Sequence, residues 1–151
     1  PGSPGYLASN LRLEGYRGAI AKADRSVNAA WGQPGDFSFD SGMTGARSLL
    51  DTSNPPSAII ASNDEMAFAV LHVANGKNIE VPGQLSVISF EDTPGARFSV
   101  PPLTAIRQPT AAMSERAARE LIAAKGNLPA VTDHVVEFQL IIRETTGHFN
   151  G

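Results

Sequence analysis

Acidic and amide side chains follow two apolar runs of the sequence, at the points where each run ends. Asn63 and Asp64 come shortly after SAIIA, and Glu91 and Asp92 close the run LSVISFE. Paired carboxylates can perform general acid/base catalysis, but neither a Ser-His pair nor a metal-ligand pattern accompanies them. Carboxylates and amides also make paired hydrogen bonds, which suit sugar hydroxyl groups, so we expect polyol recognition ahead of catalysis. The alternative is a purely structural role, in which these residues only cap a helix or lie in a solvated turn.

Helical and extended patterns alternate along the chain. Helices are expected at 11–23, 41–51, 64–75 and 109–124, and strands at 57–61, 85–91, 103–108 and 133–145, the last as an edge strand. We expect Ser9 or Asn10 to cap the first helix and Ser41 to cap the second. Strands that alternate with helices pair in parallel, which predicts the α/β class. Ligands of such sheets bind outside the carboxyl ends of the strands, where the acidic and amide residues fall.

The composition describes one soluble globular domain, with 151 residues, 42% of them hydrophobic and 18% charged, and a net charge of −3. Because Lys and Arg are scattered singly, we do not expect this chain alone to bind nucleic acid. The absence of cysteine excludes disulfides and thiolate chemistry and is consistent with a reducing cytoplasm. No apolar run is long enough for a membrane span. The chain begins without Met, so we interpret it as a fragment whose lack of a signal peptide says little.

No metal or cofactor site is expected. His72, His134 and His148 lie far apart in the sequence and lack the spacing of metal ligands. The glycines form no phosphate-binding G-x-G-x-x-G motif after a strand, which disfavours a dinucleotide. The sequence therefore predicts a site built from side chains alone.

Three motifs in a fixed order carry a resemblance to a known family. IIASNDEMAFAVL is followed by VPGQLSVISFEDTP and then by PPLTAIRQP, and LRLEGYRGAI precedes them. The chain resembles, from residue 9 to about residue 146, the sensor domain of lactose-repressor/galactose-repressor (LacI/GalR) transcription regulators. The resemblance implies a parallel-sheet flavodoxin-like lobe of a periplasmic-binding-protein-like sensor domain, with an effector, most often a sugar or nucleobase, between two lobes. It also implies a cytoplasmic repressor that grips operator DNA through an amino-terminal helix-turn-helix outside this chain.

The same resemblance divides the chain into three parts. Residues 1–108 match the carboxy-terminal lobe, incomplete at its amino end. The helix within 109–126 is expected to belong to the amino-terminal lobe that this chain lacks, and 127–151 returns to the carboxy-terminal lobe as a strand and tail. With half of the cleft absent, we expect this chain alone to bind its effector weakly or not at all.

Five residues fall on the positions at which this family contacts its effector: Arg12, Phe37, Asn63, Glu91 and Gln108. Arg12 offers a planar fork of donors for a diol or a carboxylate, although it can also be an ordinary helix-surface arginine. Phe37 offers a flat face for a pyranose ring, with a core aromatic as the alternative. Asn63 is a cap candidate that the resemblance favours as a ligand contact, and its neighbour Asp64 is expected to hold the turn.

Two local features refine these expectations. Phe39 would point away from Phe37 if that stretch is extended, because successive side chains of a strand alternate. Glu91 stands where the family usually has Asp, one methylene shorter, so we expect an effector that is smaller or differently substituted than the common one. The family's next Asp is present as Asp92.

The helix predicted at 64–75 is apolar on nearly every side between residues 66 and 74. A helix that covers a sheet needs an apolar stripe of only about 100°. The face near Phe68, Leu71 and His72 then needs a partner, and we expect a twofold homodimer that includes this helix and the loop 93–98.

Two alternatives to a repressor's sensor stay open at this stage. One is a periplasmic sugar-binding protein of a transport system, which has the same fold. The other is an α/β enzyme, which the acids near one edge of the sheet would permit, although we expect no catalytic residues.

Overall fold

The computed structural model of the chain describes residues 2, 5–26, 28–124 and 136–148. The elements are, in chain order, α1 (Leu7–Lys22), the 3₁₀ helix η1 (Ala29–Trp31), α2 (Phe39–Leu50), β1 (Ala58–Ile60), α3 (Asp64–Gly76), β2 (Ser86–Glu91), α4 (Pro94–Phe98), β3 (Thr104–Arg107), α5 (Thr110–Ala123) and β4 (Gln139–Ile141). Every helix and strand expected from the sequence has a counterpart among these elements. No described helix is long and apolar enough to cross a membrane.

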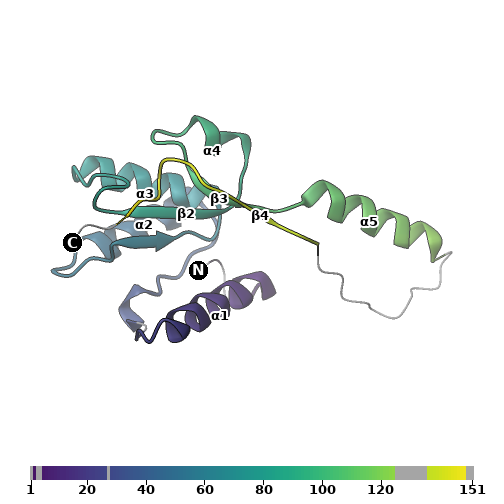
Figure 1. Cartoon of the computed structure of the whole chain (residues 1–151), viewed down its shortest axis with the longest axis horizontal. Helices are drawn as coiled ribbons and strands as arrows, with labels where there is room; N and C mark the ends of the chain where they lie inside the picture. Colours follow the sequence, from purple (N-terminus) through teal and green to yellow (C-terminus); the bar gives the residue numbers. More distant parts are fainter. Residues whose placement is uncertain (1, 3–4, 27, 125–135, 149–151) are drawn as a thin grey trace.

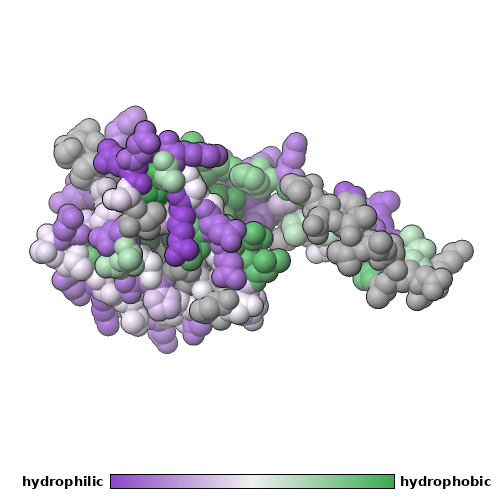
Figure 2. All heavy atoms as spheres, turned by 90° about the horizontal axis from the view of Figure 1, so that it is seen from below, coloured by the Kyte–Doolittle hydropathy of each residue, from purple (hydrophilic) through white to green (hydrophobic). Residues whose placement is uncertain are grey.

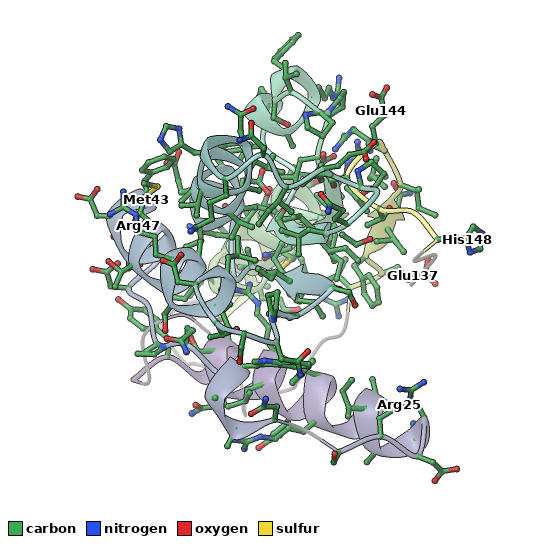
Figure 3. The ribbon with its side chains drawn as sticks, turned by 90° about the vertical axis from the view of Figure 1, so that its left-hand side faces the viewer. Arg25, Met43, Arg47, Glu137, Glu144 and His148 are labelled. Atoms are coloured by element: carbon green, nitrogen blue, oxygen red, sulfur yellow. The ribbon has the colours of Figure 1, made fainter. Side chains whose placement is uncertain are left out.

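The strands form one sheet in the order β1-β2-β3-β4. β1, β2 and β3 run parallel, with Ile59 beside Val87 and Ile88 beside Thr104. Helices α2 and α3 pack against each other, and α3 also packs against β2. Figures 1 and 3 place α1 apart from them, below the β1 edge of the sheet, and the end-on view puts Met43 and Arg47 of α2 on the opposite side from His148. The predicted α/β class is confirmed.

β4 departs from the parallel pattern because it pairs with β3 in the antiparallel sense, with Ala105 beside Ile141 and Arg107 beside Gln139. β3 runs outward into α5, which projects from the body of the molecule, and the chain returns from that direction (Figure 1). A returning segment with no crossover over the sheet can only pair antiparallel. The expected strand 133–145 is shorter than predicted, and its residues 133–135 lie outside the described part.

Two predicted helix caps are wrong. α1 begins two residues earlier than Ser9, with Tyr6 at the cap position and no side-chain cap hydrogen bond. α2 begins at Phe39, and Ser38 caps it by accepting a hydrogen bond from the backbone N–H of Ser41 at 3.1 Å. Both serines of this stretch are good caps, but Asp36 accepts hydrogen bonds from the Ser38 backbone and hydroxyl, which favours Ser38.

The core lies between the sheet and the α2–α3 pair. Leu85, Val87 and Leu103 are fully buried in this core, and most of the apolar side chains of α3 are buried with them. Gly42 lets α2 approach α3 closely, since a Cβ there would stand 2.8 Å from both the Ala69 Cβ and the Met66 Cα. Such close packing fixes α3, and with it the turn that precedes α3.

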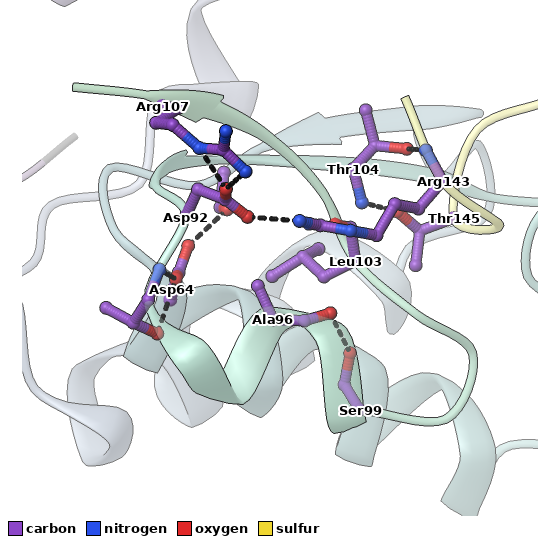
Figure 4. A network of polar contacts seen from close by, with 11 residues as sticks. Asp64, Asp92, Ala96, Ser99, Leu103, Thr104, Arg107, Arg143 and Thr145 are labelled. Atoms are coloured by element: carbon purple, nitrogen blue, oxygen red, sulfur yellow. Dashed lines mark hydrogen bonds and ion pairs between the residues drawn. The ribbon is translucent and has the colours of Figure 1, made fainter. Parts of the chain in front are cut away.

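An ion-pair cluster fastens the end of β2 to β3 and to the segment after β4 (Figure 4). The Asp92 carboxylate, 1% exposed, accepts hydrogen bonds from Arg107 Nε at 2.7 Å and from Arg143 Nη2 at 2.5 Å. Arg143 also donates from Nη1 to the Leu103 carbonyl at 2.5 Å. Although burial alone would raise the pKa of Asp92, the hydrogen bonds from Arg143 and Arg107 lower it.

We expect Arg143→Met to lower the free energy of unfolding by about 2–4 kcal/mol, because it removes two hydrogen bonds, one of them to a buried carboxylate. Chemical denaturation of both proteins measures the difference. The matched control is Arg119→Met, which breaks an exposed pair with Glu115 on α5 and should cost less than about 0.5 kcal/mol. Equal costs for the two variants would contradict the structural role of Arg143.

The lowered pKa of Asp92 also predicts a pH dependence. A carboxyl group whose pKa is lower in the folded than in the unfolded state stabilises the fold at pH values above the unfolded value. That contribution should disappear as the pH falls below about 4. Denaturation between pH 3 and pH 7 should therefore give a steeper acid loss of stability in the unaltered chain than in Asp92→Asn.

Candidate functional site

The turn between β1 and α3 is built around Asn63 and Asp64. Asn63 Oδ1 accepts a hydrogen bond from the Met66 backbone N–H at 3.0 Å, so it caps α3, and its Nδ2 donates to the Phe37 carbonyl at 2.8 Å. An amide has two lone pairs and two N–H groups, so Asn63 keeps one of each for a further partner. The capping interpretation is confirmed, and contact with an effector stays a prediction.

Asp64 is 1% exposed and holds the turn, as expected. Its Oδ1 accepts from the Ser89 hydroxyl of β2, and its Oδ2 accepts from the backbone N–H and the hydroxyl of Thr93, each at 2.7 Å. Because these donors come from β2 and the segment after it, the ends of β1 and β2 are tied together. Asp64 and Asp92 are thus both engaged in structural contacts.

Arg12 reaches into this region from α1. Its Nη1 donates to the Ser62 carbonyl at 2.7 Å, and its guanidinium carbon lies 4.4 Å from the centre of the Phe90 ring. Partial burial lowers the pKa of Arg12, and the nearby Glu91 carboxylate opposes that shift. Arg12 is therefore not a freely solvated helix-surface arginine, and its remaining N–H donors lie at the carboxyl end of β1.

Glu91 closes β2 with a left-handed backbone, at a φ of 111°. Partial burial and the Asp64 carboxylate raise its pKa, whereas the Asp64 backbone N–H and Arg12 act in the opposite direction. That N–H belongs to the first residue of α3, so the Glu91 carboxyl group lies at the amino end of this helix. Arg12, Asn63 and Glu91 are thereby brought to one edge of the sheet.

Gln108 lies one residue beyond β3, whose last residue, Arg107, pairs with Glu91. The register therefore puts Gln108 at the same edge as the other polar residues. It is half-buried, and its carbonyl accepts from the Thr110 N–H at the start of α5. Three neighbouring strand ends thus contribute to one site.

Phe37 is near this site, but its surroundings differ from the expectation. Its φ of 70° makes a sharp turn before α2, so the stretch to Phe39 is not extended and the alternation argument does not apply. The rings of Phe37 and Tyr6 meet edge to face with centroids 5.7 Å apart. Gly2 also lies against the ring, since a Cβ there would be 2.0 Å from Cζ. The amino-terminal residues therefore cover the ring that we expected a sugar to use.

Sequence reasoning missed Phe90 and Tyr6 as neighbours of the site. Phe90 directly precedes Glu91. This adjacency in the sequence was the one signal that it lies near the site. Tyr6 had no such signal because it precedes the expected helix. Among the described residues, no group of His, Cys, Asp and Glu could hold a metal ion.

A groove of about 580 Å³ lies away from these residues, between α3 and the α4 region. Its lining includes Phe68 and Leu71 from α3 and Phe98 and Val100 from the other side. Phe98 is 81% exposed, although its side chain is large and apolar. Most of α3, in contrast, is buried within its own lobe, so the unpartnered face of this helix is narrower than the sequence suggested.

Comparison with known proteins places these residues in a family. Residues 2–146 match the periplasmic binding protein-like domain. The transcriptional regulator CelR of Thermobifida fusca is 32% identical over 145 residues, which are 95% of this chain and 43% of CelR. The ribose operon repressor of Escherichia coli K12 is 37% identical over 114 residues, covering 76% of this chain and 34% of the repressor. The chain thus spans less than half the length of these curated relatives.

Solved structures agree with the sequence relatives. A complex of CelR with cellobiose superposes with a TM-score of 0.90 at 32% identity, over 95% of this chain and 44% of that one. A LacI regulator of Bacillus cereus subsp. cytotoxis superposes with a TM-score of 0.91 at 26% identity, over 97% and 52%. The chain belongs to the periplasmic binding protein-like domain family, in the form that serves LacI/GalR transcription regulators as their effector-binding domain.

Proposed function

We propose that this chain is the sugar-sensing lobe of a LacI-type transcriptional repressor. The observation that supports it most is the gathering of Arg12, Asn63, Glu91 and Gln108 at the carboxyl ends of three neighbouring parallel strands, where α/β sheets bind ligands. These groups can donate to and accept from the hydroxyl groups of one sugar ring. The likeness to CelR, which has been solved with cellobiose, supports a carbohydrate as the effector class.

The rest of the sensor is a second lobe that closes over this site. α5 projects from the body (Figure 1), and Met113, Leu121 and Ile122 are exposed on it. Apolar atoms also gather on the body beside the base of α5 (Figure 2). Such exposed apolar surface favours a covering partner. It supports the division into a lobe at 1–108, a helix of the other lobe within 109–126 and a returning segment at 127–151.

Effector binding acts in this proposal by shifting the balance between two lobe arrangements, with no covalent chemistry. A ligand shifts such a balance only through its different affinity for the two arrangements. Operator DNA is contacted by a helix-turn-helix outside these residues, in the cytoplasm. The relatives are transcription regulators rather than enzymes or transport proteins, which favours this function over both alternatives.

We expect Glu91→Gln to weaken sugar binding by about tenfold or more, because a charged acceptor at the site is replaced by a neutral amide. Isothermal titration of the full-length protein with a panel of mono- and disaccharides measures the affinity. The melting temperature should stay unchanged or rise, since the repulsion between Glu91 and Asp64 is removed.

The control is Glu14→Gln, which removes an exposed carboxylate from α1. It should leave the affinity unchanged. Equal affinities of the Glu91→Gln variant and the unaltered protein would remove Glu91 from the site. No binding of any saccharide by the unaltered protein would refute the proposed function.

The lobe pairs with a second copy through the groove between α3 and the α4 region. The exposed Phe98 and Val100 and the half-buried Phe68 supply apolar contact area there. A twofold axis through this groove would bury the same side chains on both copies. Paired lobes would present two DNA-binding segments to a palindromic operator.

We expect the chain to sediment as a dimer at tens of micromolar and Phe98→Glu to sediment as a monomer, because a carboxylate cannot be buried without a partner. Sedimentation equilibrium measures both masses. Leu11→Glu is the control, since Leu11 is also exposed but lies on α1, at the opposite end of the molecule from α4 (Figure 1). A monomeric unaltered chain, or dissociation by both substitutions alike, would contradict this interface.

A further inference from the structure

The hydroxyl group of Ser9 is buried without a hydrogen bond. Ser9 is 2% exposed, and among the described residues its Oγ is the buried side-chain polar atom that has no partner. Buried hydroxyl groups are nearly always hydrogen-bonded, because leaving one unpaired costs free energy. A helical serine can bond back to a carbonyl of the preceding turn, but this one does not. The free-energy cost of burying this unpaired hydroxyl group therefore needs an explanation.

Size alone does not supply that explanation. Where α2 and α3 need a small buried side chain, the sequence has Ala46, Ala67, Ala69 and Ala74. Alanine at position 9 would fit the same space and bury no polar atom. The choice of serine points to a use for its oxygen.

The position of Ser9 on α1 indicates what the oxygen faces. Tyr6, three residues earlier, contacts the Phe37 ring, and Arg12, three residues later, donates to the Ser62 carbonyl. Helical residues three apart lie on the same face. Ser9 therefore lies on the same face of α1 as Arg12, about one helical turn from it, and Tyr6 is the extended residue just before this helix.

Tyr6 is the group that a ligand stacked on Phe37 would displace. Tyr6 is 62% exposed, its ring meets Phe37 edge to face, and its side chain makes no capping hydrogen bond to α1. A sugar ring that stacks on Phe37 takes the place of the Tyr6 ring. The first turn of α1, with the Ser9 hydroxyl, then borders that sugar.

We propose that Ser9 is a further specificity-determining residue of the site, whose Oγ exchanges a hydrogen bond with one hydroxyl of a neutral sugar or polyol. A serine hydroxyl is one donor and an acceptor, which matches a sugar hydroxyl in either direction. The Ser9 hydroxyl group, which is unpaired without a ligand, then gains a hydrogen bond when the sugar binds. This inference rests on the proposed sugar-sensing function.

The test is Ser9→Ala in the full-length protein, titrated calorimetrically with cellobiose and with D-ribose. For a sugar that the unaltered protein binds, the affinity should fall about three- to tenfold, the range of one neutral hydrogen bond. The melting temperature without sugar should be unchanged or higher, because an unpaired buried hydroxyl is removed. Ser48→Ala, which removes an exposed hydroxyl from α2, should change neither quantity.

The outcomes separate this inference from the proposed function. Equal sugar affinity of Ser9→Ala and the unaltered protein overturns the inference and leaves the proposed function standing. A fall in affinity with a matching fall in melting temperature also overturns it, since Ser9 would then act through packing. If the unaltered protein binds neither cellobiose nor D-ribose, both the role of Ser9 and the proposed function are overturned for these two sugars.

Discussion

The buried carboxylate of Asp64 is the contact on which the site depends. It opens α3, accepts one hydrogen bond from Ser89 inside β2, and accepts two more from Thr93 just after β2. A buried carboxylate is tolerated only when such donors satisfy it, so the three segments are held together as a unit. Asn63 directly precedes Asp64, and Glu91 lies midway between Ser89 and Thr93 along the chain. The separation of Asn63 and Glu91 is therefore set by Asp64 rather than by contacts of their own.

This arrangement explains why much of the site could be predicted from local sequence. A buried apolar run followed by Asn63 and Asp64 fixes a strand end and a helix start within a few residues, and both signals are short-range. The second run places Glu91 in the same way. Parallel pairing then brings the strand ends to one edge without any knowledge of side-chain contacts. The family motifs added Arg12 and Gln108, whose roles no local pattern could reveal.

The parts that sequence did not predict depend on contacts between distant segments. The left-handed backbone of Phe37 has no glycine to announce it, and the Tyr6 ring that covers Phe37 precedes the expected helix. Arg107 and Arg143 read as ordinary strand arginines, yet both pair with Asp92. Ion pairs between residues 15 and 51 positions apart depend on how the chain folds, so patterns in one sequence do not predict them. The antiparallel sense of β4 is unpredicted for the same reason.

The return of the chain after α5 has a consequence for the order in which the lobe is made. Arg143 lies 51 residues after Asp92, and α5 is synthesised between them. As the chain leaves the ribosome, β1, β2 and β3 can pair while Asp92 has only Arg107 as its cation. The free β3 edge stays open to other strands until β4 emerges and closes it. β4, which is translated after α5, thus protects the edge of a sheet whose other strands have already formed.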